Sequence, residues 1–308
     1  MSVFSNPLWI DKRLLTCSSL DEIPESIFKE INQGLSLQSK AEPLASVVIP
    51  AWNEEVNIVR TLHSLSKSKT SFPFEIIVVN NNSTDRTQEA LDRLPAVRNI
   101  FQPVKGCGPA RQIGQEHAQG KYILMADADC FYPQNWIQKM VKALEKKNVA
   151  LVYGRYSFLG TREMPRWKLA IYEFLKDGIS EVRHVNRPCV NAVGMSMGYV
   201  KDLGLKAGFV KTPVRGEDGR LCFLLREMGK IDQVRDRSIR VWTLPRTLAK
   251  DGSLFFAMIT RVTKELTRLL QYFYKQKAHN VHATGEYKPK SVEYLNRLKA
   301  LGKKKEAA

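Results

Sequence analysis

The sequence predicts an α/β protein whose mixed, mostly parallel sheet carries helices on both faces, followed by a C-terminal amphipathic helix. Between residues 45 and 154, short apolar runs alternate with segments in which apolar residues recur every three or four positions. Strands that alternate with helices are typical of a parallel sheet, which must be covered on both faces. In such sheets, ligands bind beyond the carboxyl ends of the strands.

The individual elements follow from these patterns. Strands are expected at five apolar runs, residues 46–51, 74–80, 98–102, 121–127 and 149–154. Helices are expected between them, at residues 53–65, 83–94 and 135–147. Asn53 is the expected N-cap of the first helix, and Asp85 with Gln88 forms the expected capping box of the second.

The second half of the chain has a less regular pattern. Residues 156–247 contain isolated glycines and short apolar runs, and within them residues 216–229 predict a loop that opens into a helix closed by a glycine. Residues 253–276 predict a long amphipathic helix, and the tail after it is polar and basic. Such a helix packs on its own domain or lies on a membrane surface, and the pattern favours the domain.

The composition restricts the classes of partner and compartment. The 308 residues carry a formal net charge of +17, which favours nucleic acid, an anionic membrane surface or phosphorylated substrates as partners, unless the charge serves solubility alone. The longest apolar runs fall well below the roughly 18 residues of a spanning helix, and no signal-peptide pattern opens the chain. Five scattered cysteines without a CxxC pair fit a reduced, cytoplasmic protein without a zinc site.

Two aspartates end the fourth expected strand. Asp127 and Asp129 are two positions apart, so in an extended segment their side chains point the same way. A pair of carboxylates at a strand end suits a hard divalent cation such as Mg²⁺ or Mn²⁺. The alternative is that Asp129 caps the next helix and Asp127 is a solvated turn residue.

Three further constellations also follow strand ends or open helices. Glu217 and Asp218 stand at a helix start, where acids are favoured by the helix dipole, but where one of them could also act as a general base. Arg111 lies in the first turn of a helix after a glycine-rich turn, where it could meet a diphosphate or remain a solvated arginine. Asn81 is one of three asparagines that could form a tight turn or bind a base edge.

Taken in order, these segments resemble the nucleotide-diphospho-sugar transferases of glycosyltransferase family 2, which have the GT-A fold. The resemblance covers residues 46–250 and is carried by four segments: "VVIPAWNEE", "IIVVNNNSTDRT", "GPARQIGQEHAQGKYILMADAD" and "GEDGRLCFLLREMGKI". As an ordered set they are far more specific than any one of them. The sequence pattern predicts a helical extension over 1–44 and a helix with a basic tail over 251–308, and the resemblance implies a GT-A domain over 45–250. Within the domain, it implies a nucleotide-binding half over 45–154 and an acceptor half over 155–250.

The resemblance also implies roles for single residues. Asp218 would be the general base, with Glu217 beside it at the acceptor, and Asp129 would bind the metal with Asp127 close to the metal and the ribose. The remaining implied donor-site residues are Pro50, Ala51, Glu54, Asn81, Arg111 and Arg246. The implied enzyme is a hexosyltransferase-like glycosyltransferase that uses Mn²⁺ or Mg²⁺ and transfers a sugar with inversion from a nucleotide-diphospho-sugar, with UDP favoured, to a hydroxyl acceptor.

The sequence departs from the family pattern in three places. Asn81 stands where aspartate is common, and an amide both accepts and donates, which loosens the choice of base. Trp242 stands where a histidine metal ligand is often found. The Q-x-x-R-W motif of processive synthases is absent, which favours transfer of a single sugar.

Several rival functions remain open. A sugar nucleotidyltransferase would carry a glycine-rich loop after the first strand, where this chain has "PAWNEE". A nucleic-acid-binding protein would interleave its basic residues with aromatic ones or form a recognised module, and neither is found, so nucleic acid is not favoured as a partner. An inactive relative that binds nucleic acid or membrane through its basic surface is the main alternative. The charge also suits a cytoplasmic enzyme that is peripheral on the inner face of a membrane and meets a lipid-linked or cell-envelope acceptor.

Overall fold

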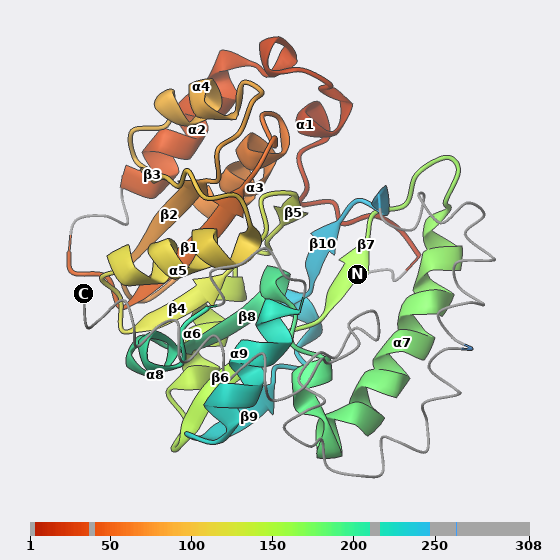
Figure 1. Cartoon of the computed structure of the whole chain (residues 1–308). Coiled ribbons are helices and arrows are strands. Elements are labelled where there is room, and N and C mark those ends of the chain that lie inside the picture. The colour runs from red at the N-terminus through yellow and green to blue at the C-terminus, as the bar shows by residue number, and fades with distance from the viewer. Residues whose placement is uncertain (1–3, 37–40, 210–215, 247–262, 264–308) are drawn as a thin grey trace.

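The fold is built around one seven-stranded sheet. The computed structural model describes residues 4–36, 41–209, 216–246 and Thr263 (Figure 1). The strand order is β3-β2-β1-β4-β8-β6-β9. The bounds are β1 Ala45–Ala51, β2 Phe74–Asn80, β3 Arg98–Phe101, β4 Tyr122–Met125, β6 Val149–Tyr153, β8 Met197–Val200 and β9 Lys230–Gln233.

Most of the neighbouring strands are parallel. β1 pairs in parallel with β2 and β4, β2 with β3, and β6 with β9, while β8 runs antiparallel to β4 and β6. The prediction of a mixed, mostly parallel sheet is therefore confirmed. Because β1, β2 and β4 run the same way, the polar segments that follow them meet at one edge of the sheet.

Helices cover both faces of this sheet, as expected for parallel strands buried on both sides. One face packs against α2 Glu25–Ser36, α3 Asn57–Ser66, α4 Thr87–Asp92 and α6 Trp136–Leu144. The other face packs against α5 Cys107–His117, α8 Lys201–Ala207 and α9 Glu217–Arg226. Among the helices that the structure describes, none is both long and apolar enough to cross a bilayer.

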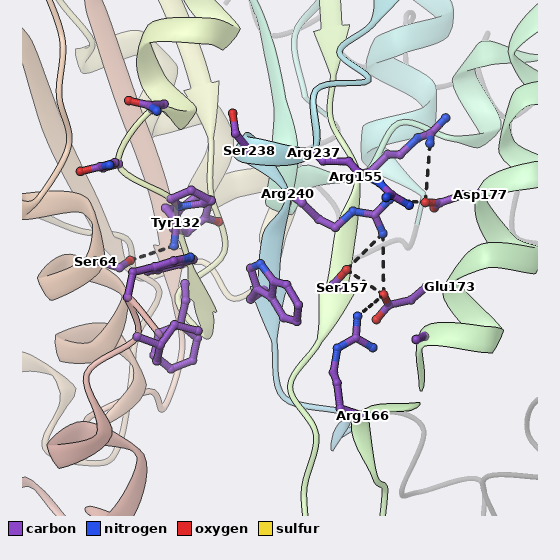
Figure 2. A pocket seen from close by; sticks show the side chains of 18 of the residues that line it. Ser64, Tyr132, Arg155, Ser157, Arg166, Glu173, Asp177, Arg237, Ser238 and Arg240 are labelled. Atoms are coloured by element: carbon purple, nitrogen blue, oxygen red, sulfur yellow. Dashed lines mark hydrogen bonds and ion pairs between the residues drawn. The ribbon is translucent and has the colours of Figure 1, made fainter. Parts of the chain in front are cut away.

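A second, three-stranded sheet lies beside the first and carries the longest described helix. Its order is β5-β10-β7, with β5 Cys130–Phe131, β10 Val241–Thr243 and β7 Tyr156–Phe158. The helix α7, Arg166–Asn186, runs along the outer side of this sheet in Figure 1. A pocket of about 1130 Å³ lies between α7 and the second sheet (Figure 2). Ion pairs line its wall, including Arg166 with Glu173 at 2.7 Å.

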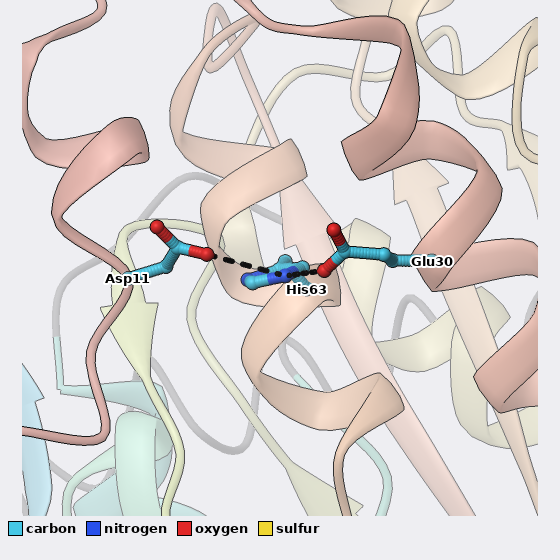
Figure 3. Close-up of side chains that lie close together, drawn as sticks. All are labelled: Asp11, Glu30 and His63. Carbon is cyan, nitrogen blue, oxygen red and sulfur yellow. Dashed lines mark hydrogen bonds and ion pairs between the residues drawn. The ribbon is translucent and has the colours of Figure 1, made fainter.

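The N-terminal segment docks on α3 through buried polar contacts. The Arg60 guanidinium donates to the Leu14 carbonyl at 2.9 Å and to the Cys17 carbonyl at 2.6 Å, which fixes the end of α1, Lys12–Thr16. His63 Nε2 lies 2.9 Å from a Glu30 oxygen on α2 and 4.0 Å from an Asp11 oxygen (Figure 3).

These three side chains could in principle hold a cation, but Arg13 already pairs with both carboxylates at 2.7 and 3.0 Å. We therefore interpret the cluster of Asp11, Glu30 and His63 as a structural contact between the N-terminal segment and α3.

Two expected helix caps are wrong. Asn53 has a φ of 54° in the left-handed region, and α3 begins only at Asn57. The Asn53 side chain instead accepts a hydrogen bond from the Thr84 backbone at 2.8 Å, which ties the β1 and β2 loops together. No capping box forms between Asp85 and Gln88, because Gln88 bonds to the Asn80 side chain at 2.7 Å.

The segment that the sequence marked as irregular contains α7, which the sequence did not predict. Apart from Thr263, the amphipathic helix expected over 253–276 and the tail lie outside the described residues.

Candidate functional site

Three strand ends supply the site. β1 ends at Pro50 and Ala51, and the backbone N–H of Asn81, just after β2, donates to the Ala51 carbonyl at 2.8 Å. The Glu54 backbone N–H donates to the Thr87 hydroxyl at 2.8 Å, which fixes the loop between β1 and α3. Parallel pairing of β1 with β4 places the Asp127 segment next to these loops.

The turn that carries Asp127 and Asp129 is held by two buried side chains that the sequence did not identify. The Asp127 backbone N–H donates to the Tyr132 hydroxyl at 2.8 Å, and that hydroxyl donates to the Met195 carbonyl at 3.0 Å. The Thr61 hydroxyl lies 2.8 Å from both the Ala128 and Cys130 carbonyls. These bonds fix the backbone on both sides of each aspartate, so their carboxylates are held at one place.

This turn presents a group of side chains that could hold a metal. Ligand atoms of Asp127, Asp129 and Cys130 all lie within 4.8 Å of one another. Burial raises the pKa of the Cys130 thiol well above its usual value, so it remains protonated and is a poor ligand. The oxygen ligands that remain are those of a hard divalent cation such as Mg²⁺ or Mn²⁺.

A buried arginine lies at the centre of the site. Arg111 is only 3% exposed, and its guanidinium pairs with Glu217 at 2.9 Å, with Asp127 at 3.3 Å and with Asp218. These three carboxylates come from the β4 end and from the start of α9, more than 85 residues apart in the chain. The structure therefore brings together four of the residues that the sequence singled out separately.

Gly194 allows this arrangement. Its backbone N–H donates to one carboxylate oxygen of Asp218 at 2.9 Å, and Arg111 donates to the other oxygen. A Cβ at this position would lie 2.5 Å from Cζ of Arg111, closer than carbon atoms can approach. A side chain here would therefore displace the guanidinium, and the sequence gave no signal for this close approach.

Burial shapes the protonation of the two carboxylates beside Arg111. Desolvation raises the pKa of Asp127 to about 7, despite the opposing effect of the Arg111 charge. Desolvation also raises the pKa of Asp218, again opposed by Arg111 and by the bond from Gly194. The guanidinium is thus the main group that favours the ionised form of both side chains.

A second arginine contacts the other aspartate of the turn. Arg246, just beyond β10, pairs with Asp129 and lies 3.3 Å from a Glu54 oxygen. Desolvation raises the pKa of Glu54. Arg246 is therefore bound to the same carboxylate that the sequence analysis assigned to a metal.

Asn81 organises a loop in this structure. Its side-chain amide donates to the Val104 carbonyl at 2.7 Å and accepts from the Gly106 N–H at 2.7 Å. These bonds shape the turn into α5, which carries Arg111. Trp52, which the sequence analysis passed over, is 55% exposed beside this loop, with Lys105 Nζ 5.9 Å from its ring. The sequence signal that could have identified Trp52 is its position as an aromatic residue directly after the first strand.

Trp242, which replaces an expected histidine ligand, faces a different part of the molecule. Its ring lies 5.0 Å from the Arg166 guanidinium at the start of α7. Among the described residues, the candidate ligand group at the aspartate turn contains no histidine.

Known proteins share this sequence pattern and fold. The profile of glycosyl transferase family 2 matches residues 46–202. The glycosyltransferase AglE of Haloferax volcanii is 32% identical over 124 residues, which are 38% of this chain and 40% of that protein. The dolichyl-phosphate beta-glucosyltransferase ALG5A of Trichomonas vaginalis is 37% identical over 125 residues, 35% of this chain and 39% of that protein. The chain spans about half or less of the length of the curated relatives it matches.

Solved structures confirm the predicted GT-A-type architecture. S. aureus TarS 1-349 superimposes with a TM-score of 0.53 at 19% identity, covering 84% of this chain and 79% of that one. The mannosyltransferase PcManGT from Pyrobaculum calidifontis, solved with GDP-Man and Mn²⁺, gives 0.53 at 16% identity, covering 84% and 77%. The family profile matches about half of the chain and includes the aspartate turn, so this protein belongs to glycosyl transferase family 2.

Proposed function

We propose that this protein is a metal-dependent, inverting glycosyltransferase that moves one sugar from a nucleotide-diphospho-sugar to a hydroxyl acceptor. The observation that carries the proposal is the convergence of Arg111 with Asp127, Glu217 and Asp218. The buried Arg111 guanidinium links the aspartate turn, which could hold a metal, to a pair of acids that includes a candidate base. Transfer from a nucleotide-diphospho-sugar would use positive charge and a base at one place. Family membership supports the same reaction class.

The donor is proposed to bind along the ends of β1, β2 and β4. The exposed ring of Trp52 offers a stacking surface for a base, with Pro50 and Ala51 beside it and Asn81 shaping the loop opposite. We favour a UDP-sugar, and the relative of this fold that was solved with GDP-Man keeps a guanine nucleotide as the alternative.

Asp129 and Asp127 are the proposed ligands of Mn²⁺ or Mg²⁺. When bound, the cation would act as a Lewis acid that offsets charge on the leaving diphosphate. Arg246 would exchange its contact with Asp129 for a phosphate oxygen, because a guanidinium pairs with phosphate as well as with carboxylate. Glu54 lies 3.3 Å from Arg246 and could hold it nearby.

Asp218 is the proposed general base. The acceptor hydroxyl would give its proton to the Asp218 carboxylate while its oxygen bonds to the anomeric carbon, and the bond from that carbon to the diphosphate oxygen breaks. The nucleoside diphosphate leaves with the electron pair, and attack from the opposite face inverts the carbon. Burial raises the pKa of Asp218, so Arg111 and the Gly194 N–H would keep it ionised before transfer. Glu217, also bound to Arg111, would line the acceptor side.

The acceptor and the location follow from charge. The net charge of +17 suits a protein at an anionic membrane surface, where a lipid-linked acceptor would be found. Relatives named dolichyl-phosphate beta-glucosyltransferases support a lipid-linked acceptor as the first class to test.

The first experiment measures thermal stability with UDP, GDP, UDP-glucose or GDP-mannose, each with Mn²⁺, Mg²⁺ or chelator. We expect one nucleotide series to stabilise the protein only with metal, and Asp129→Asn to abolish that shift. Asp202→Asn is the matched control, because Asp202 is an exposed carboxylate on α8. A folded protein that responds to no nucleotide, but binds RNA or DNA in low salt, would contradict the proposal and support the non-enzymatic alternative.

A further inference from the structure

α7 exposes an apolar surface. Thirteen large apolar side chains are exposed among the described residues, and six of them belong to this one helix. Phe174 and Val185 are 76% and 77% exposed. We define the outer face of α7 as Trp167, Ile171, Phe174, Leu175, Val182 and Val185. Most of these positions recur at spacings of three or four, so they share one side of the helix.

Two acidic residues of α7, Glu173 and Asp177, point toward the protein instead. Glu173 is buried, pairs with Arg166 at 2.7 Å and accepts from the Ser157 hydroxyl at 2.8 Å (Figure 2). Asp177 pairs with Arg240 and lies 3.6 Å from Arg155.

Glu181, the third acid on this helix, pairs with Arg235 at 2.9 Å and also with Arg155. The acids of α7 are therefore paired with Arg166 of the helix itself and with Arg155, Arg235 and Arg240 from the segments next to β7, β9 and β10, although the Glu181 side chain is 40% exposed. Although α7 also buries Leu169 and Tyr172, its outward side carries apolar residues where an ordinary surface helix carries polar ones.

We infer that the outer face of α7 docks on an anionic lipid bilayer. An exposed contiguous apolar surface marks a binding site rather than a solvent-facing one. Two charged side chains lie at the edges of this face: Lys168, whose Nζ lies 5.5 Å from the Trp167 ring, and Glu181, which is paired with Arg235 and Arg155. A tryptophan beside a lysine suits the level of lipid headgroups, because the ring takes the apolar side and the ammonium takes the phosphate side.

Charge distinguishes this occupant from a second copy of the chain. Two copies at +17 each repel one another, whereas an anionic bilayer attracts the same charge. The face also continues inward, because Phe174, Leu175 and Val182 line the pocket between α7 and the second sheet.

This inference rests on the proposed membrane location but not on the transfer reaction. The test is flotation of the full chain with two kinds of vesicle, one of pure phosphatidylcholine and one of phosphatidylcholine with about 30% phosphatidylglycerol. The second kind has a negatively charged surface. We expect the wild type to bind the anionic vesicles. Phe174→Glu with Val185→Glu should weaken this binding by a factor on the order of ten or more, because two apolar side chains lose their burial.

Phe101→Glu is the matched control. Phe101 is 57% exposed at the end of the edge strand β3, so the change adds one glutamate in place of an exposed phenylalanine, as Phe174→Glu alone does on α7. It should leave vesicle binding within about twofold of wild type, as one peripheral charge contributes little. If the double glutamate variant does not fold, Phe174→Ala with Val185→Ala replaces it, and a several-fold loss is expected.

Three outcomes would overturn the inference. The first is wild-type protein that stays unbound with anionic vesicles. The second is equal loss in the α7 variant and in Phe101→Glu, which would attribute binding to charge alone. The third is a dimer in light scattering that the α7 variant dissociates, which would assign the face to a second copy. The nucleotide-induced thermal shift, measured without vesicles, reports the donor site separately and should be unchanged in all variants.

Discussion

The change Gly194→Ala tests whether the position of Arg111 governs the site. The added Cβ would lie 2.5 Å from Cζ of Arg111, so the guanidinium must move or the Gly194 backbone must shift. Either movement disturbs the contacts of Arg111 with Asp127, Glu217 and Asp218.

The expected magnitude follows from the bonds that are lost. A hydrogen bond to a charged group contributes about 1.5–3 kcal/mol, and removing one partner of a buried ion pair costs about 3–5 kcal/mol. Partial displacement should therefore cost about 2–4 kcal/mol of unfolding free energy. If the same loss falls on the transition state, kcat/KM should decrease by about 30- to 1,000-fold.

The pH profile separates this mechanism from general destabilisation. Arg111 lowers the pKa of Asp218 against the effect of burial, so moving the guanidinium away should raise that pKa. Asp218 would then lose its proton at a higher pH, so the acidic limb of the kcat/KM profile should shift to higher pH. The assay is release of nucleoside diphosphate from the donor sugar that binds best, between pH 5 and 9.

Gly178→Ala is the matched control, because a Cβ at that α7 position meets nothing within 4 Å. It should stabilise the helix slightly, by about 0.5–1 kcal/mol, and leave the pH profile unchanged. Wild-type kcat/KM and an unshifted profile in Gly194→Ala would refute the role that we assign to this close approach.

Three further predictions concern other parts of the structure. Arg246→Ala removes the guanidinium bound to Asp129, so Mn²⁺ affinity without nucleotide should increase about threefold to tenfold, while nucleotide affinity should fall. Titration calorimetry measures both affinities, and finding both unchanged would contradict this prediction. Tyr132→Phe removes the hydroxyl that joins the Asp127 N–H to the Met195 carbonyl, so urea unfolding should show a loss of about 1–3 kcal/mol, and no loss would mean that the turn is held by other bonds. Burial lowers the pKa of His63 below its usual 6.5, so the folded state holds this proton less tightly than the unfolded state, and stability should fall as pH drops below about 6.5. His63→Gln should flatten that dependence in thermal unfolding, and an unchanged slope would assign it to another group.

The sequence by itself determined the class of fold, and it predicted most members of the candidate site. Apolar runs that alternate with helical patterns fix strand and helix identity locally, because burial on two faces requires continuous apolar strands. Polar residues after β1, β2 and β4 mark the ligand edge, because parallel strands share one carboxyl end. Asp127, Asp129, Glu217, Asp218 and Arg111 were therefore predicted as site residues without coordinates, although each alone had an ordinary structural explanation.

The tertiary structure alone decided how these residues are connected. Arg111 meets acids that follow it by 16 and by more than 100 positions, and no local pattern encodes such a contact. Gly194, Tyr132 and Thr61 escaped notice for the same reason, since their importance lies in what approaches them. The helix α7 was not predicted, and two of its acids, Asp177 and Glu181, are paired with arginines brought from other elements. Local propensity and periodicity act over a few residues, whereas a buried charge network is specified by the packing of distant segments, so the structure was needed to reveal it.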